Sequence, residues 1–478
     1  MTMTSTASPQ LTSAAAAPML WRIASVLFAV LLLVFTEQLG LPVSVIVWSC
    51  FVVVLTARPS TRATGLLFLA LTAYSVTAWL AAAYGNHYFL PLPRLTDIET
   101  TTMLDLRCVV AAYLGAEVLF GAARIDRAVR NASRLVRAKI IAMSDTIVRP
   151  LALIVLFAVG AWDWIALLRA GLGSVLSGTR REYASLLLLG SDHNVQFVVI
   201  ALSVLAGVFL LFCDRKLPVV VAITICWSPF ILAGSRKELL LVAAAIALVM
   251  ATSAARRKLA IVGGLVAFMF VRPVLSTGDV YDALHEFILP QYLHFALTMG
   301  IIRPDFAGSF FDRAQFLLPG PLRVSEPVDM ALAFYNTGAA NVGVGANPFA
   351  EAATAAGSLP VELVFALIFN GLLAIIVASS SALPFLSVMA YSQLLTFGRS
   401  DTWIAMFFIV YTALTLHALS FLTRKRATHE HASSHAHLPL RHEHDRPAGS
   451  PSAIPDLAGA AEPELLRHAR GAVDRTLV

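Results

Sequence analysis

The chain has 478 residues, of which 58% are hydrophobic and only 13% are charged, and its mean hydropathy is +0.76. Soluble domains carry roughly a quarter charged residues, so this composition excludes a water-soluble globular fold. The formal net charge is +6 at pH 7, and we expect no nucleic-acid partner.

Apolar runs of about 17 to 21 residues recur along the chain, and each is about long enough to cross a bilayer as a helix. Residues 1–18 form a Ser/Thr/Ala stretch without Lys or Arg, so they lack the basic start of a cleavable signal peptide, and we expect the first span to be retained. The sequence therefore predicts an all-α polytopic membrane protein with about twelve transmembrane helices. The expected spans are 19–36, 41–57, 64–84, 104–122, 150–168, 195–213, 218–233, 239–255, 259–275, 360–378, 382–398 and 402–422.

Basic residues in alternate connections predict the topology, because cytoplasmic loops are enriched in Lys and Arg. This pattern places both termini in the cytoplasm, with residues 1–18 as the N-terminal tail. The basic residues of these connections are Arg58, Arg62, Arg124, Arg127, Arg130, Arg134, Arg137, Lys139, Arg215, Lys216, Arg256, Arg257, Lys258, Arg424, Lys425 and Arg426.

The segments outside the predicted spans are short, with two exceptions. Residues 276–359 form a long extracytoplasmic loop between the spans of 19–275 and those of 360–422, and long loops in compact proteins are commonly functional. Within it, residues 286–302 are apolar enough to lie as a helix on or in the outer interface. Residues 423–478 are polar and His-rich, which predicts a disordered cytoplasmic tail, with metal binding as the alternative.

Cations on the predicted outer face break the positive-inside pattern. Arg236 and Lys237 lie in a tight turn between two apolar helices, at the membrane surface. Placing an ionisable group so close to lipid costs free energy unless the group is paired or exposed to water. Arg236 and Lys237 are therefore candidates for substrate binding. The alternative is that either side chain extends to water along the lipid surface or pairs with Glu238.

Further outer cations are Arg180 and Arg181, which follow a glycine-containing stretch, and Arg313 in the long loop. For Arg180 and Arg181 a local pair with Glu182 is the alternative. Guanidinium groups match phosphate oxygens with two parallel hydrogen bonds. Several of them converging on one outer cavity would suit a lipid diphosphate and would stabilise the charge on that leaving group during glycosyl transfer.

Such a transfer also needs a carboxylate or histidine to take the proton of the attacking hydroxyl. We select Glu351 and His294 as candidate catalytic residues, although Glu351 could instead cap a helix N-terminus. No Asp-x-Asp pair occurs in the outer segments, so we expect neither a metal nor a cofactor. All the acidic and histidine candidates lie in the long loop: Asp279, Asp282, His285, Glu286, His294, Asp312, Glu326, Asp329 and Glu351.

Three features resemble the O-antigen polymerase, or oligosaccharide repeat-unit polymerase (Wzy-type), family of membrane proteins. They are the turn at residues 233–236 before an apolar helix, the long outer loop late in the chain, and the exit from that loop. The exit runs from Asn341 through Gly343, Gly345 and Glu351 to Gly357, before the helix that contains Asn370 and Gly371. The resemblance covers the layout of roughly residues 150–400.

The resemblance implies a metal-independent polymerase at the outer face of the bacterial cytoplasmic membrane. Such an enzyme transfers a glycan from polyprenyl diphosphate to another lipid-linked unit, for cell-surface or extracellular polysaccharide, and works with flippase and chain-length regulator proteins. By this resemblance Arg236 would contact the diphosphate, and Arg180 or Arg181 would complete the cationic site. The chain departs from the family pattern at Lys237, where small residues are common, and in having Ala rather than an aromatic residue between Glu351 and Gly357.

Two other functions remain open. A glycan ligase would use the same type of lipid-linked donor and the same arginines. A transporter or flippase for an anionic lipid or sugar predicts internal repeats and ionisable residues near mid-membrane, whereas this sequence shows no repeat and places its charges mostly at the outer interface.

Overall fold

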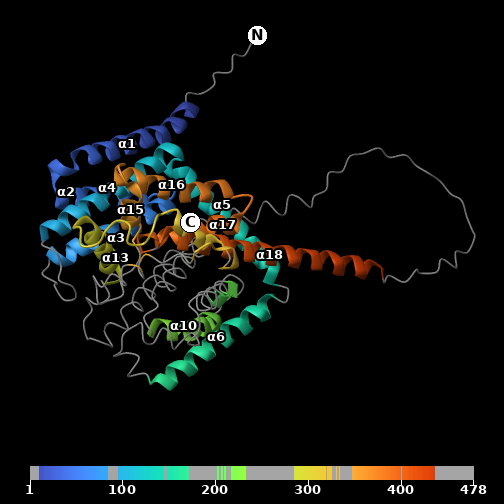
Figure 1. Ribbon diagram of the computed structural model, residues 1–478. Helices are drawn as coiled ribbons and strands as arrows, with labels where there is room; N and C mark the ends of the chain where they lie inside the picture. The colour runs from blue at the N-terminus through green and yellow to red at the C-terminus, as the bar shows by residue number, and fades with distance from the viewer. Residues whose placement is uncertain are drawn as a thin grey trace, which may run out of the picture. The chain divides into compact units, whose positions relative to one another are not determined.

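The computed structural model describes residues 10–83, 95–144, 148–171, 217–232, 285–318, 320–325, 347–399 and 401–436, with short pieces at 202–203, 206–207, 209–210, 330 and 333. In these residues every regular element is a helix (Figure 1). The α-helices are α1 (Gln10–Leu39), α2 (Leu41–Ala57), α3 (Arg62–Ala83), α4 (Leu95–Leu119), α5 (Ala122–Ser144), α6 (Val148–Ala170), α10 (Leu217–Leu232), α13 (His285–Thr298), α15 (Pro348–Ala356), α16 (Val361–Ser379), α17 (Pro384–Leu395) and α18 (Thr402–Ala436). Short 3-10 helices are η3 (Asp312–Leu317), η4 (Gly320–Leu322) and η5 (Phe397–Arg399).

The chain divides into two compact units, Met1–Lys425 and Arg426–Val478. In the second unit, the described residues 426–436 are helical. The rest of the structure described below belongs to the first unit.

Several helices are apolar and long enough to cross a membrane. Four meet this description singly, namely Met19–Leu39, Arg62–Ala83, Val148–Arg169 and Val361–Ser379, and a fifth span arises if α4 and α5 are counted together. The expected helical architecture is confirmed, with four or five apolar helices long enough to cross a membrane. The predicted count of twelve stays a prediction, because the spans 239–255 and 259–275 and most of 195–213 lie outside the described residues.

Several helix bounds differ from the predicted ones. Helix α1 begins at Gln10 rather than at residue 19, and α18 continues to Ala436, so the first part of the expected disordered tail is helical. Helix α4 begins at Leu95, ahead of the predicted span 104–122. After Gly121 the chain continues as α5, bent by 80° from α4, where the sequence had predicted only a basic connection.

Contacts between distant segments bring parts of several helices together at two separate places. At one end, Ala63 N donates to Asp126 Oδ1 at 2.8 Å, and Tyr391 Oη donates to Ala63 O at 2.9 Å. At the other end, Arg107 pairs with Glu37 at 2.8 Å and with Glu362 at 3.0 Å. An alternating up-and-down path of the helices explains why residues so far apart in sequence meet in this way.

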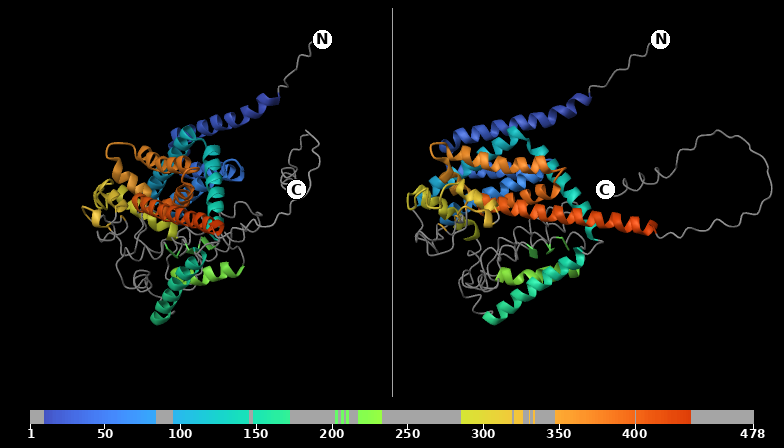
Figure 2. Two further views of the ribbon diagram at one scale, coloured as in Figure 1. Left: turned by 90° about the vertical axis from the view of Figure 1, so that its right-hand side faces the viewer. Right: turned by 45° about the vertical axis from the view of Figure 1, so that its right-hand side comes forward.

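The core between these ends is built from α2, α3, α4 and α16, which pack side by side (Figure 2). Trp48 and Tyr113 lie at its centre with their rings 5.7 Å apart, and Phe68 contacts both. The indole N–H of Trp48 donates to Thr72 Oγ1 at 2.8 Å, so this buried donor is satisfied.

Helices α2 and α3 approach each other closely at Gly65, and this contact can be tested. A Cβ atom at Gly65 would lie 2.5 Å from Thr56 N and 2.7 Å from Thr56 Cα, which are backbone atoms. We expect Gly65→Ala to destabilise the protein by about 1–3 kcal/mol through overpacking. The measurement is the thermal midpoint of the purified protein in detergent.

Gly371 provides the matched control, because it also lies inside a helix but a Cβ atom added to it would meet nothing within 4 Å. Gly371→Ala should leave the midpoint unchanged or raise it, since alanine favours the helix by about 0.5–1 kcal/mol. Equal midpoints for the two variants would contradict the close approach of α2 and α3.

Candidate functional site

Helix α13, like α15, is a described helix of the long loop that enters the core. It packs against α3, α4 and α15, and Leu293, Phe295 and Ala296 are fully buried. The sequence predicted a helix over residues 286–302 on or in the outer interface, and the helix is present over His285–Thr298. Its middle is covered by other helices rather than lying on a surface, because its apolar residues are distributed around the helix and not along one face.

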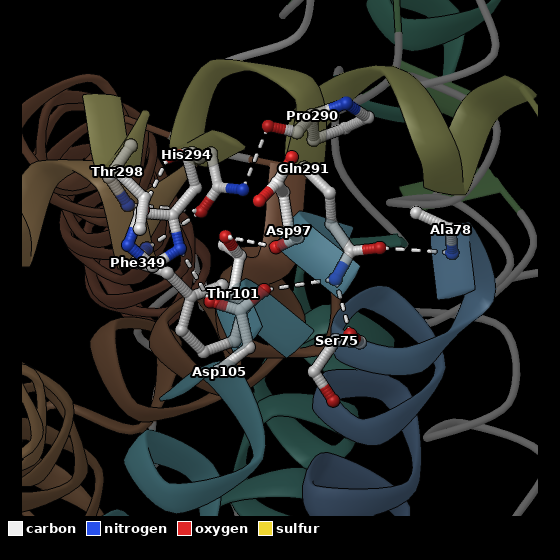
Figure 3. A network of polar contacts seen from close by, with 12 residues as sticks. Ser75, Ala78, Asp97, Thr101, Asp105, Pro290, Gln291, His294, Thr298 and Phe349 are labelled. Atoms are coloured by element: carbon white, nitrogen blue, oxygen red, sulfur yellow. Dashed lines mark hydrogen bonds and ion pairs between the residues drawn. The ribbon is translucent and has the colours of Figure 1, made fainter. Parts of the chain in front are cut away.

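Gln291 ties α13 to two other helices (Figure 3). Its side-chain Nε2 donates to Asp105 Oδ2 at 2.9 Å and to the carbonyl of Ser75, and its Oε1 accepts from Ala78 N at 3.0 Å. The amide therefore makes three hydrogen bonds inside a buried region, where an unsatisfied amide would be costly. These bonds fix the position of α13 against α3 and α4.

One turn further along α13, His294 is paired with the same carboxylate. His294 Nδ1 lies 2.6 Å from Asp105 Oδ1, and the two side chains are 1% and 0% exposed. As a carboxylate, Asp105 accepts on both oxygens, so we assign the proton to Nδ1 of His294 and leave Nε2 as the acceptor nitrogen. Nε2 is buried and has no hydrogen-bond partner among the described residues.

The ring of His294 is also held from a second side. It stacks on Phe349 with the ring centroids 6.5 Å apart and an angle of 18° between the planes. A histidine whose tautomer and orientation are set by a carboxylate, and whose other nitrogen is free, is chemically suited to take a proton from a hydroxyl.

Asn347 positions the helix that carries Phe349. Its Oδ1 accepts from Phe349 N at 2.7 Å and from Ala350 N at 3.3 Å, while its Nδ2 donates to Pro290 O at 2.8 Å. Asn347 is thus the N-cap of α15, and Pro348 occupies the first helical position, where proline is favoured. One side chain both begins α15 and ties it to α13.

Arg313, in η3, forms a second buried cluster with two carboxylates. Its Nη1 donates to Asp401 Oδ2 at 2.8 Å, and its Nη2 lies 3.2 Å from Glu351 Oε1. The second contact lacks hydrogen-bond alignment, since neither atom has a hydrogen-bond partner in the described part of the chain. All three side chains are at most 1% exposed.

Both carboxylates also cap the first turn of α18. Asp401 Oδ1 accepts from Trp403 N at 3.0 Å, and Glu351 Oε2 accepts from Thr402 N at 2.8 Å. The alternative considered for Glu351, helix capping, therefore applies to a different helix from its own. Carboxylates at a helix N-terminus are favoured by its free N–H groups and its dipole.

The cluster has one cation facing two carboxylates, so with both acids ionised it would carry a net negative charge in a buried place. Burial raises the pKa of Glu351 to about 8, the Asp401 carboxylate acts in the same direction, and Arg313 opposes them. A protonated Glu351 leaves the cluster neutral, which is the less costly state away from water.

Three of the predicted site residues are among the described residues, and the structure places them in these two clusters. His294 is in the first, and Glu351 and Arg313 are in the second; α15 links the clusters, because Phe349 contacts His294 and Glu351 contacts Arg313. The guanidinium of Arg313 faces protein carboxylates, so a role in diphosphate binding would require those contacts to open. Arg180, Arg181, Arg236 and Lys237 lie outside the described residues.

The sequence reasoning missed Asp105, Gln291 and Asp401. Asp105 had a signal, because it is a carboxylate inside the predicted span 104–122 and such residues are functional candidates by default. Its partner could not be found in the same way, since His294 is 189 residues away.

Within the described ranges, no group of three or more His, Cys, Asp and Glu side chains could hold a metal ion. No protein-family model, curated protein or solved structure matches the chain.

The protonation of Glu351 gives a pH test. Its carboxyl has a pKa of about 8 when folded, against an ordinary value of 4.5, so its contribution to stability is present below about pH 4.5 and is lost as the pH rises through about 8. We expect the thermal midpoint of the wild type to fall over this window, and that of Glu351→Gln to fall less. A wild type and variant with parallel midpoint–pH curves would contradict a protonated Glu351.

Proposed function

We propose that the protein is a membrane glycosyltransferase that polymerises polyprenyl-diphosphate-linked oligosaccharide units at the outer face of the bacterial cytoplasmic membrane. The observation that carries this proposal is the buried Asp105–His294 pair, 2.6 Å apart, with Nε2 of His294 lacking a partner among the described residues. In this proposal His294 is the base that takes the proton of the attacking hydroxyl, and the sequence had already indicated it as a candidate for that role.

In the proposed reaction, the acceptor hydroxyl gives its proton to His294 Nε2 as its oxygen attacks the anomeric carbon of the donor. The bond between that carbon and the diphosphate oxygen breaks, and the polyprenyl diphosphate leaves with the electron pair. Asp105 stabilises the imidazolium that forms, because its carboxylate accepts from Nδ1. His294 is buried, so the proposal requires α13 or its neighbours to shift and admit the acceptor.

The diphosphate would be bound by the outer cations Arg180, Arg181, Arg236 and Lys237. Clustered cations stabilise the negative charge that develops on a departing diphosphate, so neither a metal nor a cofactor is required by this mechanism. Their assignment rests on the sequence and on the resemblance to the Wzy-type polymerases.

The topology needed by this proposal has support from the grouping of the helix connections. His294, Arg313 and Arg107 lie with the connections predicted to be outside, whereas the arginine-rich α5 lies with those predicted to be inside. Cytoplasmic connections are enriched in arginine, so we propose that both termini are cytoplasmic.

A transporter or flippase for an anionic lipid or sugar is the second candidate. The observation that favours it is the same buried pair, because carboxylate–histidine pairs within membrane proteins also carry protons in transporters. A glycan ligase is a third reading that would use the same base and the same donor.

The glycan profile of a strain without this protein separates these functions. A polymerase predicts accumulation of single lipid-linked repeat units, because the units are made and displayed but not joined. Unattached polymer would indicate a ligase instead, and a profile without any accumulated glycan intermediate would favour the transporter.

In that strain, complementation with His294→Gln should restore less than about 1% of the polymer made by the wild type, since a positioned base contributes about 10²–10⁴-fold. Asp105→Asn should act in the same direction, and so should Arg236→Ala if that residue binds the diphosphate. Membrane levels of each variant are measured by immunoblot.

His417→Gln is the matched control, because His417 in α18, which is half-buried, is also packed against an aromatic ring, that of Phe385 at 5.2 Å. Its Nε2 likewise has no hydrogen-bond partner in the described residues. Normal polymer in the His294→Gln strain, with the protein present in the membrane, would exclude His294 as the base.

A further inference from the structure

Helix α5 lies across the bundle instead of along it. It is bent by 80° from α4, and the chain turns at Gly121, where φ is +77°. The right-hand view of Figure 2 shows α5, in teal, running across the direction of α1 and α16. If α4 crosses a membrane, then α5 lies close to the membrane plane.

The two faces of α5 differ in chemistry. Its apolar face, which includes Ile125, Val129 and Val136, is buried, and the helix packs against α3, α16 and α17. The opposite face exposes four arginines at helical spacing, Arg124, Arg127, Arg130 and Arg134. Arg130 pairs with Asp126 at 2.7 Å, whereas no ion pair joins Arg124, Arg127 or Arg134 to another described residue.

Further arginines lie at the bend where α5 begins. Arg22 donates from Nη2 to the carbonyls of Glu117 and Val118, each at 2.8 Å, and so caps the end of α4. Next to it, the guanidinium of Arg58 stacks over the Trp21 ring at 3.7 Å. Tryptophan and arginine at the ends of apolar helices mark the depth of the lipid headgroups.

The nearby carboxylates pair with two of these cations: Glu117 Oε1 lies 3.9 Å from Arg22 Nε, and Asp126 pairs with Arg130. Among the described residues of α4 and α5, Glu117 and Asp126 are the acids beside the bend, and both are buried. Glu117 Oε2 accepts from Ala122 N, and Asp126 Oδ1 accepts from Ala63 N, each at 2.8 Å. Both carboxylates also accept hydrogen bonds at the starts of α5 and α3, and no acid among the described residues pairs with Arg124, Arg127 or Arg134.

We propose that this face, formed by Arg124, Arg127 and Arg134 with Arg22 and Arg58 at the bend, binds the phosphodiester headgroups of anionic phospholipids. Guanidinium groups match phosphate oxygens, and the orientation of α5 places them in a row along the headgroup layer. Val118 and Leu119, exposed beside the bend, would meet acyl chains, which favours a lipid over a nucleic acid or an acidic protein. This site is independent of the proposed glycosyl transfer.

The test uses the purified full-length protein in nanodiscs of phosphatidylcholine with increasing phosphatidylglycerol. Retained phosphatidylglycerol is measured by native mass spectrometry after extraction at low and high salt. An arginine near an anionic surface contributes about 1 kcal/mol, so each Arg→Gln substitution should weaken binding about fivefold, and the triple variant R124Q/R127Q/R134Q about 100-fold. Binding by the wild type should fall with salt.

Two controls keep the result interpretable. Arg303→Gln, at an exposed arginine in the long loop, should bind as the wild type does, and the triple variant R124K/R127K/R134K should keep most of the binding because it keeps the charge. Unchanged lipid binding by the triple glutamine variant would overturn the proposal. So would an equal loss in Arg303→Gln, because the loss would then follow from the total charge of the protein and not from this face.

Discussion

The arrangement around the candidate site depends on the hydrogen bonds of Gln291. A helix from the long loop can enter the core only if its polar groups are satisfied there, and this one amide bonds to α3 through Ser75 and Ala78 and to α4 through Asp105. Because Asp105 is held by Gln291 on one oxygen, its other oxygen is aimed at His294. The same hydrogen bonds that admit α13 therefore also orient the candidate base.

A second constraint acts where α18 begins. The first turn of a helix has free N–H groups, and here they are met by Asp401 and by Glu351 from α15. Bringing two carboxylates together away from water requires a cation, which η3 supplies as Arg313. Arg313 therefore joins the loop to α15 and α18, and its removal alone would leave the buried carboxylate of Asp401 without a cation beside the protonated Glu351.

The two ends of the helices have different electrostatic character. At the end of the bundle where α13 lies, cations and acids are paired, as Arg107 of α4 is with Glu37 and Glu362. At the end where α5 lies, Glu117 and Asp126 accept hydrogen bonds from the first turns of α5 and α3. The arginines of α5 are exposed there. This difference follows from the amphipathic sequence of α5, whose apolar residues recur at helical spacing and so cover the ends of α3, α16 and α17 while its arginines remain exposed.

The sequence by itself determined the helical membrane character and most helix positions, because apolar runs of sufficient length have few alternatives to a helix: the predicted span 41–57 coincides with α2, and 360–378 differs from α16 by one residue at each end. It also indicated His294, Glu351 and Arg313 as chemically relevant. Only the tertiary structure decided their partners, since Asp105 and Asp401 reach them over 189 and 88 residues of chain. Periodicity and composition report on local structure, whereas the pairing of buried charges depends on which helices pack together.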